Sequence, residues 1–95
     1  MLGQKLKELR ESRGLLQRQV AAELDVDTAY ISKMESNDKP VSRSYLPTFA
    51  SLFTVDEQDL QTLWLADRVY DLLKNETLGL KAIAEAEFQL KQALG

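Results

Sequence analysis

Apolar side chains recur every three or four residues along almost the whole chain, and no segment alternates apolar and polar residues as a half-buried strand does. This periodicity most constrains the fold, because it predicts helices in nearly every segment. A first helix is expected over about residues 2–13, since Gly14 is a favourable helix stop. Two shorter helices are expected from Gln17 and from the residues after Asp27, the second ending near Ser36. The sequence therefore predicts an all-α fold.

The remaining helices are expected to start at capping residues. Ser44 can cap a fourth helix, with a proline in its first turn, where the missing N–H is tolerated. Asp56 can cap a fifth helix that runs to about Lys74, and Asn75 or Thr77 can cap a sixth.

The residue types that are missing restrict the function. The 95 residues suit one domain with an appendage, and they include no cysteine and no histidine. This composition removes zinc fingers, thiol redox chemistry, the usual metal clusters and the commonest general base. No apolar run approaches the roughly 20 residues of a membrane helix, and the first ten residues lack the apolar core of a signal peptide. We expect a cytoplasmic protein with no membrane, cofactor or metal, and no nucleophile–base pair suggests an enzyme.

The distribution of charge is more informative than the net charge of −3. Residues 1–45 carry eight basic and seven acidic side chains, whereas residues 46–95 carry four basic and eight acidic ones. A phosphate backbone would therefore be contacted by the first half, through a few well-placed cations.

Residues 17–36 have the layout of two short helices joined by about three turn residues, which is a helix-turn-helix. Ala21 is small enough for the two helices to touch, and Asp27 is a natural N-cap for the second. The remaining positions that such a corner needs to be apolar are Val20, Leu24, Val26, Ile31 and Met34.

With these residues in place, the sequence resembles the lambda-repressor-like helix-turn-helix regulators, also described as Cro-type or xenobiotic-response-element regulators. The resemblance covers about residues 2–60, through "LKELRESRGLLQRQVAAELDVDTAYISKMES" and "LPTFASLFTVDEQDL". It implies a five-helix DNA-binding domain over residues 1–60 whose third helix enters the major groove. Residues 61–95 would then be a helical extension.

The resemblance also implies site residues. Gln17 would touch the DNA backbone, and base edges would be met by Thr28, Ala29, Tyr30 and Lys33. Candidate phosphate contacts, which position a protein without reading sequence, are Arg18, Lys39, Ser42, Arg43 and Ser44.

Several of these residues have alternative interpretations. Lys33 can donate to guanine O6 or N7, but it can also be a solvated surface lysine. Thr28 and Ala29 can contact a thymine methyl group or simply let the helix approach DNA. Tyr30 can reach a sugar or phosphate, or it can be a half-buried aromatic.

Three further residues have expected structural roles. Family members pair an arginine late in the first helix with a glutamate ending the third, and Arg10 and Glu35 stand at those places. We expect a partly buried, bidentate ion pair. The family usually has glycine where Asp25 stands, in a left-handed turn that aspartate tolerates better than most residues.

The extension carries more apolar side chains than a short tail can hide. One interpretation folds them back on the domain's own core, and the one we favour is a dimerisation element that sets two third helices about 34 Å apart on a pseudo-palindromic operator. The segment "LWLADRVYDLLKNE" also resembles the extension of some bacterial regulators encoded near restriction-modification genes. The expected interface residues are Trp64, Leu72, Ile83, Leu90 and Leu94.

The sequence therefore favours a homodimeric, sequence-specific transcription regulator, acting as a repressor or autoregulator on double-stranded DNA. The alternative is a protein-interaction module, such as an antitoxin or adaptor, that acts through its acidic helical hairpin.

Overall fold

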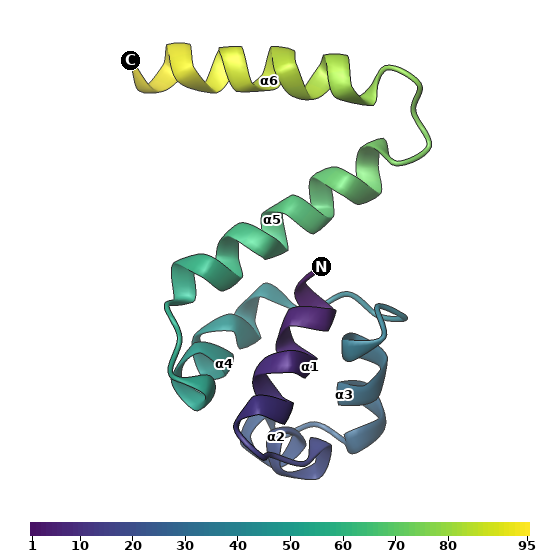
Figure 1. Ribbon diagram of the computed structural model, residues 1–95, viewed down its shortest axis with the longest axis vertical. Helices are drawn as coiled ribbons and strands as arrows, with labels where there is room; N and C mark the ends of the chain where they lie inside the picture. The colour runs from purple at the N-terminus through teal and green to yellow at the C-terminus, as the bar shows by residue number, and fades with distance from the viewer.

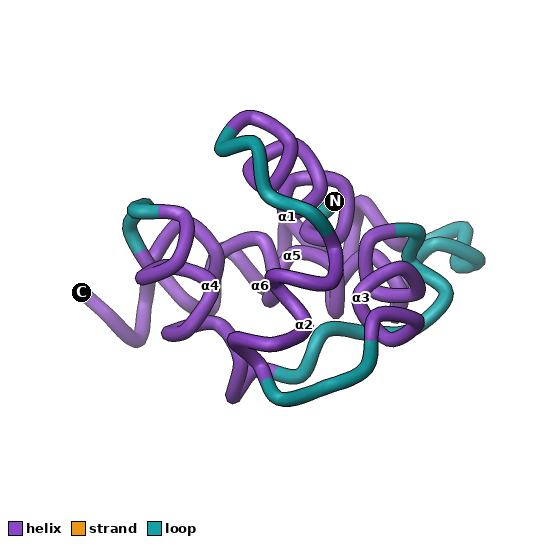
Figure 2. The backbone as a smooth tube through the Cα atoms, turned by 90° about the horizontal axis from the view of Figure 1, so that it is seen from below, coloured by secondary structure: helices purple, strands orange, loops and turns teal.

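The computed structural model describes residues 1–95 as helices joined by short loops, with no strand (Figures 1 and 2). None of the helices is both long and apolar enough to cross a membrane. This architecture confirms the predicted all-α, lambda-repressor-like fold. The elements are α1 (Leu2–Ser12), α2 (Gln17–Leu24), α3 (Thr28–Glu35), the 3₁₀ turn η1 (Arg43–Tyr45), α4 (Leu46–Phe53), α5 (Glu57–Leu73) and α6 (Gly79–Leu94).

Two of the predicted caps are present. The Asp27 carboxylate accepts a hydrogen bond from the Tyr30 N–H at 2.9 Å and caps α3. The Asp56 carboxylate accepts one from the Gln58 N–H at 2.9 Å and caps α5. Each cap satisfies one of the backbone donors that a helix N-terminus leaves free.

The predicted cap at Ser44 is wrong. Ser44 lies inside η1, and its hydroxyl is hydrogen-bonded to that of Ser42 at 3.0 Å. The chain enters α4 directly from this 3₁₀ turn, so Tyr45 occupies the N-cap position without a side-chain cap. Pro47 does lie in the first turn of α4, as expected.

The predicted start of the sixth helix is also wrong. Helix α6 begins at Gly79, and neither Asn75 nor Thr77 caps it. The connection is instead made by the backbone, where the Glu76 N–H donates to the Leu73 carbonyl at 2.9 Å. The side chains of Asn75 and Thr77, which could cap a helix, therefore make no capping hydrogen bond to α6.

The core lies among the first five helices. Helix α1 contacts α3, α4 and α5, while α2 contacts α3 and α4 contacts α5. The buried apolar side chains form one cluster: Leu2, Leu6, Leu9, Val20, Ala21, Leu24, Ile31, Met34, Val41, Leu46, Phe49, Ala50, Phe53 and Leu60.

Gly3 shows how closely α1 and α3 approach each other. A Cβ atom at this position would overlap the Met34 carbonyl oxygen and lie 2.6 Å from Oδ1 of Asn37. Glycine is therefore required here for packing, because any side chain would push α1 away from the end of α3.

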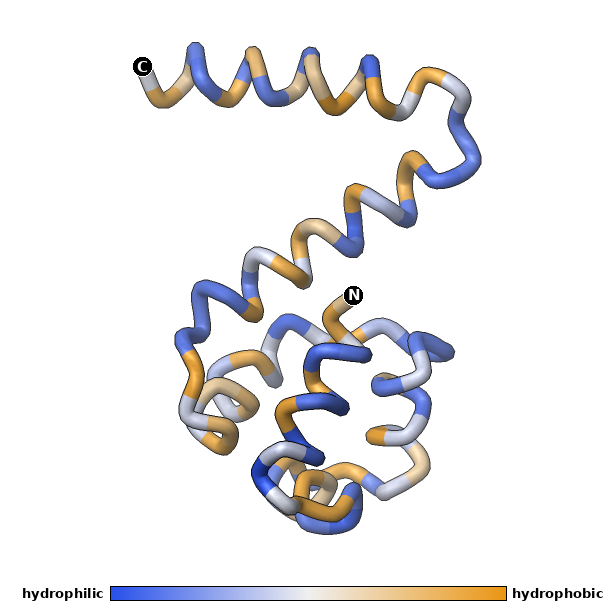
Figure 3. The backbone as a smooth tube through the Cα atoms, viewed as in Figure 1, coloured by the Kyte–Doolittle hydropathy of each residue, from blue (hydrophilic) through white to orange (hydrophobic).

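Helix α5 has two apolar faces. Leu60 is buried against the domain, whereas Leu65, Val69 and Leu72 lie on another face and are exposed. The chain turns back after α5, and α6 runs on the far side of α5 from α1–α4 (Figure 1); among its residues only Gly79 is buried. Apolar positions recur along both helices (orange in Figure 3), so the extension presents apolar surface that its own chain does not cover.

Candidate nucleic-acid interface

The turn between α2 and α3 has the geometry that a helix-turn-helix requires. Asp25 adopts the left-handed conformation, with φ 57° and ψ 47°, as expected at a position where the family usually has glycine. The Val26 N–H donates to the Ala21 carbonyl at 3.0 Å and closes the turn. With Asp27 capping α3, the first turn of this helix is presented at the surface.

Arg10 and Glu35 form the ion pair expected from the sequence. Arg10 Nε lies 2.7 Å from Glu35 Oε2, and its Nη2 lies 3.1 Å from Oε1, so the contact is bidentate. The side chains are only 11% and 6% exposed. The hydrogen bond to Glu35 raises the pKa of Arg10 above its ordinary value, although burial acts in the opposite direction. The pair thus ties α1 to the end of α3 in a largely water-free setting.

Gln17 joins this pair, which the sequence did not predict. Its Nε2 donates to Glu35 Oε1 at 3.0 Å, and Arg10 Nη1 donates to the Leu15 carbonyl at 2.9 Å. We call Arg10, Gln17 and Glu35 the interhelix network. Because Gln17 is the first residue of α2, one carboxylate fixes the relative positions of α1, α2 and α3.

The outer face of α3 is open. Thr28, Ala29 and Lys33 are exposed, and Lys33 takes part in none of the ion pairs of the structure. Tyr30 differs from them, because its half-buried ring packs edge-on against Tyr45 with the centroids 6.2 Å apart. The structure thus follows the alternative interpretation of Tyr30 as a half-buried aromatic.

The predicted phosphate contacts are all exposed. The basic ones differ in whether other side chains hold them in place. Arg18 and Lys39 have no side-chain hydrogen bond or ion pair. Arg43 is held in place, because its Nε donates to Gln61 Oε1 at 2.7 Å and its guanidinium lies 4.9 Å from the centre of the Trp64 ring.

Trp64 is not a free apolar side chain. Its ring is half-buried against the core, and its Nε1 donates to the Val41 carbonyl at 2.7 Å. This placement agrees with the fold-back interpretation of the extension. The other expected interface residues are exposed by 43% to 88%: Leu72, Ile83, Leu90 and Leu94.

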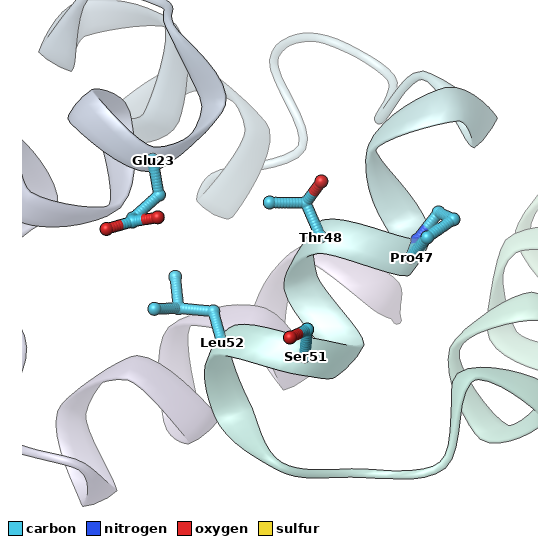
Figure 4. A pocket seen from close by; sticks show the side chains of 5 residues that line it. All are labelled: Glu23, Pro47, Thr48, Ser51 and Leu52. Carbon is cyan, nitrogen blue, oxygen red and sulfur yellow. The ribbon is translucent and has the colours of Figure 1, made fainter.

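A shallow groove of about 430 Å³ lies between α2 and α4, lined by Glu23, Pro47, Thr48, Ser51 and Leu52 (Figure 4). No hydrogen bond joins the carboxylate of Glu23 to the hydroxyl of Thr48 or Ser51.

Replacing Glu35 with Gln should destabilise the domain. The variant keeps the shape of the side chain but leaves a nearly buried guanidinium without its counter-charge, so we expect the free energy of unfolding to fall by about 3 kcal/mol. Urea denaturation followed by helical circular dichroism measures this. The control is Glu87→Gln, the same change in the exposed pair with Lys91, which should leave the midpoint unchanged. Equal midpoints for the two variants would contradict the claim that the interhelix network stabilises the domain.

Comparison with known proteins agrees with this geometry. The model of a family described as "Helix-turn-helix domain" matches residues 1–63. A propionyl-CoA carboxylase regulator from Cereibacter sphaeroides is 40% identical over 60 residues, which are 63% of this chain and 13% of that protein. This chain thus spans only a small part of the relative's length. No solved structure matches this chain. The fold, the turn and the family match together show that this chain belongs to the helix-turn-helix domain family of DNA-binding regulators.

Proposed function

We propose that this protein is a sequence-specific transcription regulator, a repressor or autoregulator, that binds a pseudo-palindromic operator as a homodimer. The observation that carries the proposal is the open face of α3, held rigidly by the interhelix network and bearing one unpaired cation, Lys33. A helix presented in this way fits the major groove of B-form DNA.

The proposed contacts divide into two groups. Thr28, Ala29 and Lys33 meet base edges, since they occupy the start and the exposed face of α3. Gln17 keeps a second hydrogen on Nε2 beyond the one donated to Glu35, and this hydrogen can donate to a phosphate. The remaining proposed backbone contacts are Arg18, Lys39, Ser42, Arg43 and Ser44, with the Tyr30 hydroxyl as a further candidate.

The homodimer is supported by the exposed apolar surface of the extension. Ile83 and Leu90 are one heptad apart on one side of α6, with Leu80 and Leu94 beside them, and all four are exposed. Helix α6 has 16 residues and buries none of them except Gly79, and most helical stability in proteins comes from packing of an apolar face, so we infer that α6 gains stability from a partner surface. We propose that this surface is the same extension of a second copy, because a symmetric pair also places two α3 helices on the two halves of an operator.

The name of the relative supports a regulatory role. That protein is a regulator, but this chain covers only 13% of its length. We therefore propose a regulatory role for this chain, and we propose nothing about which enzyme it regulates.

Replacing Lys33 with Ala should relax sequence preference. Wild-type protein and variant are each used to select duplexes from a random pool, and the enriched sequences are compared. The variant is expected to lose its preference at one base pair in each half-site, at a cost of about 1–3 kcal/mol in discrimination. Equal loss of affinity for selected and random duplexes would contradict base reading by Lys33. Failure of the wild-type protein to enrich any sequence would overturn the proposed function itself.

Replacing Ile83 and Leu90 together with Ser should give monomers in sedimentation equilibrium. The control replaces Gln89 and Gln92 with Ser, two polar positions on the other side of α6, and should remain dimeric. Since α6 contributes no buried side chain to the core, the domain of α1–α5 should stay folded in both proteins, and loss of the partner should lower the unfolding temperature of the Ile83 and Leu90 variant alone. A monomeric wild-type protein, or a dimeric Ile83 and Leu90 variant, would contradict this interface, and a stable complex with a different protein would favour the interaction-module alternative.

A further inference from the structure

The guanidinium groups of two arginines both lie against the ring of Trp64. The guanidinium of Arg43, in η1, lies 4.9 Å from the ring centre, and that of Arg68, in α5, lies 4.8 Å from it. The ring itself is fixed by its hydrogen bond to the Val41 carbonyl. Cation–π attraction therefore holds two like charges near each other at a defined place on the surface.

No carboxylate neutralises these arginines. Neither takes part in an ion pair of the structure. The two carboxylates near Arg68 on α5 have other partners: Asp67 accepts from the Leu2 N–H at 2.8 Å, and Asp71 lies 3.5 Å from Lys74 Nζ. Neither guanidinium beside Trp64 is thus paired with a carboxylate of its own chain.

The pair lies beside the surface already proposed to meet DNA. A groove of about 410 Å³ lies between the loop that follows α3 and helix α5, and its charged side chains are three cations, Lys39, Arg68 and Lys74, and two carboxylates, Asp67 and Asp71. Lys39 and Arg43 belong to the loop and turn that connect α3 to α4, so the cations continue from the helix-turn-helix onto α5. Trp64 and Arg68 both lie beyond residues 1–63, the part of the chain that the helix-turn-helix model matches.

We propose that Arg43 and Arg68, held by Trp64, form a phosphate clamp that extends DNA backbone contact from the helix-turn-helix onto α5. A guanidinium that lies over an aromatic ring can still donate from its edges. Arg43 uses its Nε for Gln61 and keeps its Nη groups, while the Arg68 side chain makes no hydrogen bond within the chain, so both can donate to the oxygens of a phosphodiester. Holding the side chains in advance lowers the entropy lost on binding. The clamp positions the protein and reads no bases. It rests on the proposed DNA-binding function.

The test measures how affinity for random-sequence duplex DNA of about 30 base pairs depends on salt. Loss of one phosphate contact lowers the slope of log affinity against log salt by about 0.9. Arg68→Gln should therefore reduce the slope by about one and weaken binding several-fold at low salt. Lys81→Gln, which removes one exposed charge from α6, is the matched control and should match the wild-type protein. Identical slopes for the two variants would overturn the clamp.

Trp64 offers a second readout, because it is the only tryptophan in the chain. Adding the same duplex should change its fluorescence in the wild-type protein and in Lys81→Gln. Unchanged emission at saturating duplex would overturn the clamp, since bound DNA would then not reach this ring.

Two further outcomes separate the explanations. If the wild-type protein binds no duplex at all, the proposed function fails; if it binds and only the Arg68 effect is missing, the clamp alone fails. Sedimentation of Arg68→Gln should equal that of the wild-type protein. Dissociation of this variant would make Arg68 an interface residue and overturn its phosphate role.

Discussion

The carboxylate of Glu35 is the point on which the arrangement of the DNA-binding half depends. It accepts hydrogen bonds from Arg10 on α1 and Gln17 on α2 while it ends α3, so three helices meet at one charge that is 6% exposed. Burying such a charge is unfavourable unless its partners satisfy it, and here they do, since no buried polar side-chain atom lacks a partner. The position of α3 relative to α1 and α2 is therefore narrowly defined, which is what a helix that reads bases requires.

The second half of the chain has the opposite character. Helix α5 begins as part of the core through Leu60 and remains attached to the domain through Trp64, but its outer face and nearly all of α6 are open. Trp64 lies between the part of α5 that packs on the core and the part that is exposed. Its hydrogen bond to Val41 reaches back to the loop after α3, and the arginine beside it on α5 is adjacent to the exposed apolar face. The proposed DNA contacts and the proposed dimer surface are thus joined by a short, ordered connection.

Local signals in the sequence predicted much of this fold. The cap at Asp27 and the all-helical class follow from backbone chemistry and periodicity, whereas the left-handed Asp25 and the Arg10–Glu35 pair follow from the family resemblance. The features that were not predicted depend on contacts between distant residues. Gln17 turns toward Glu35, Gly3 is required by the approach of α3, and Trp64 contacts a carbonyl 23 residues away. The starts of α4 and α6 were misplaced because Ser44 and Thr77 are good caps in sequence, whereas the backbone formed its own turns there.

The most direct test of the central claim is selection of genomic fragments by the full chain, followed by sequencing. A dimer that places two α3 helices on one duplex predicts enrichment of one inverted repeat whose half-site centres lie about one helical turn, or a multiple of it, apart. Enrichment of an unpaired half-site would contradict the symmetric dimer while preserving DNA reading. Recovery of fragments without any common sequence would contradict the claim that α3 reads bases.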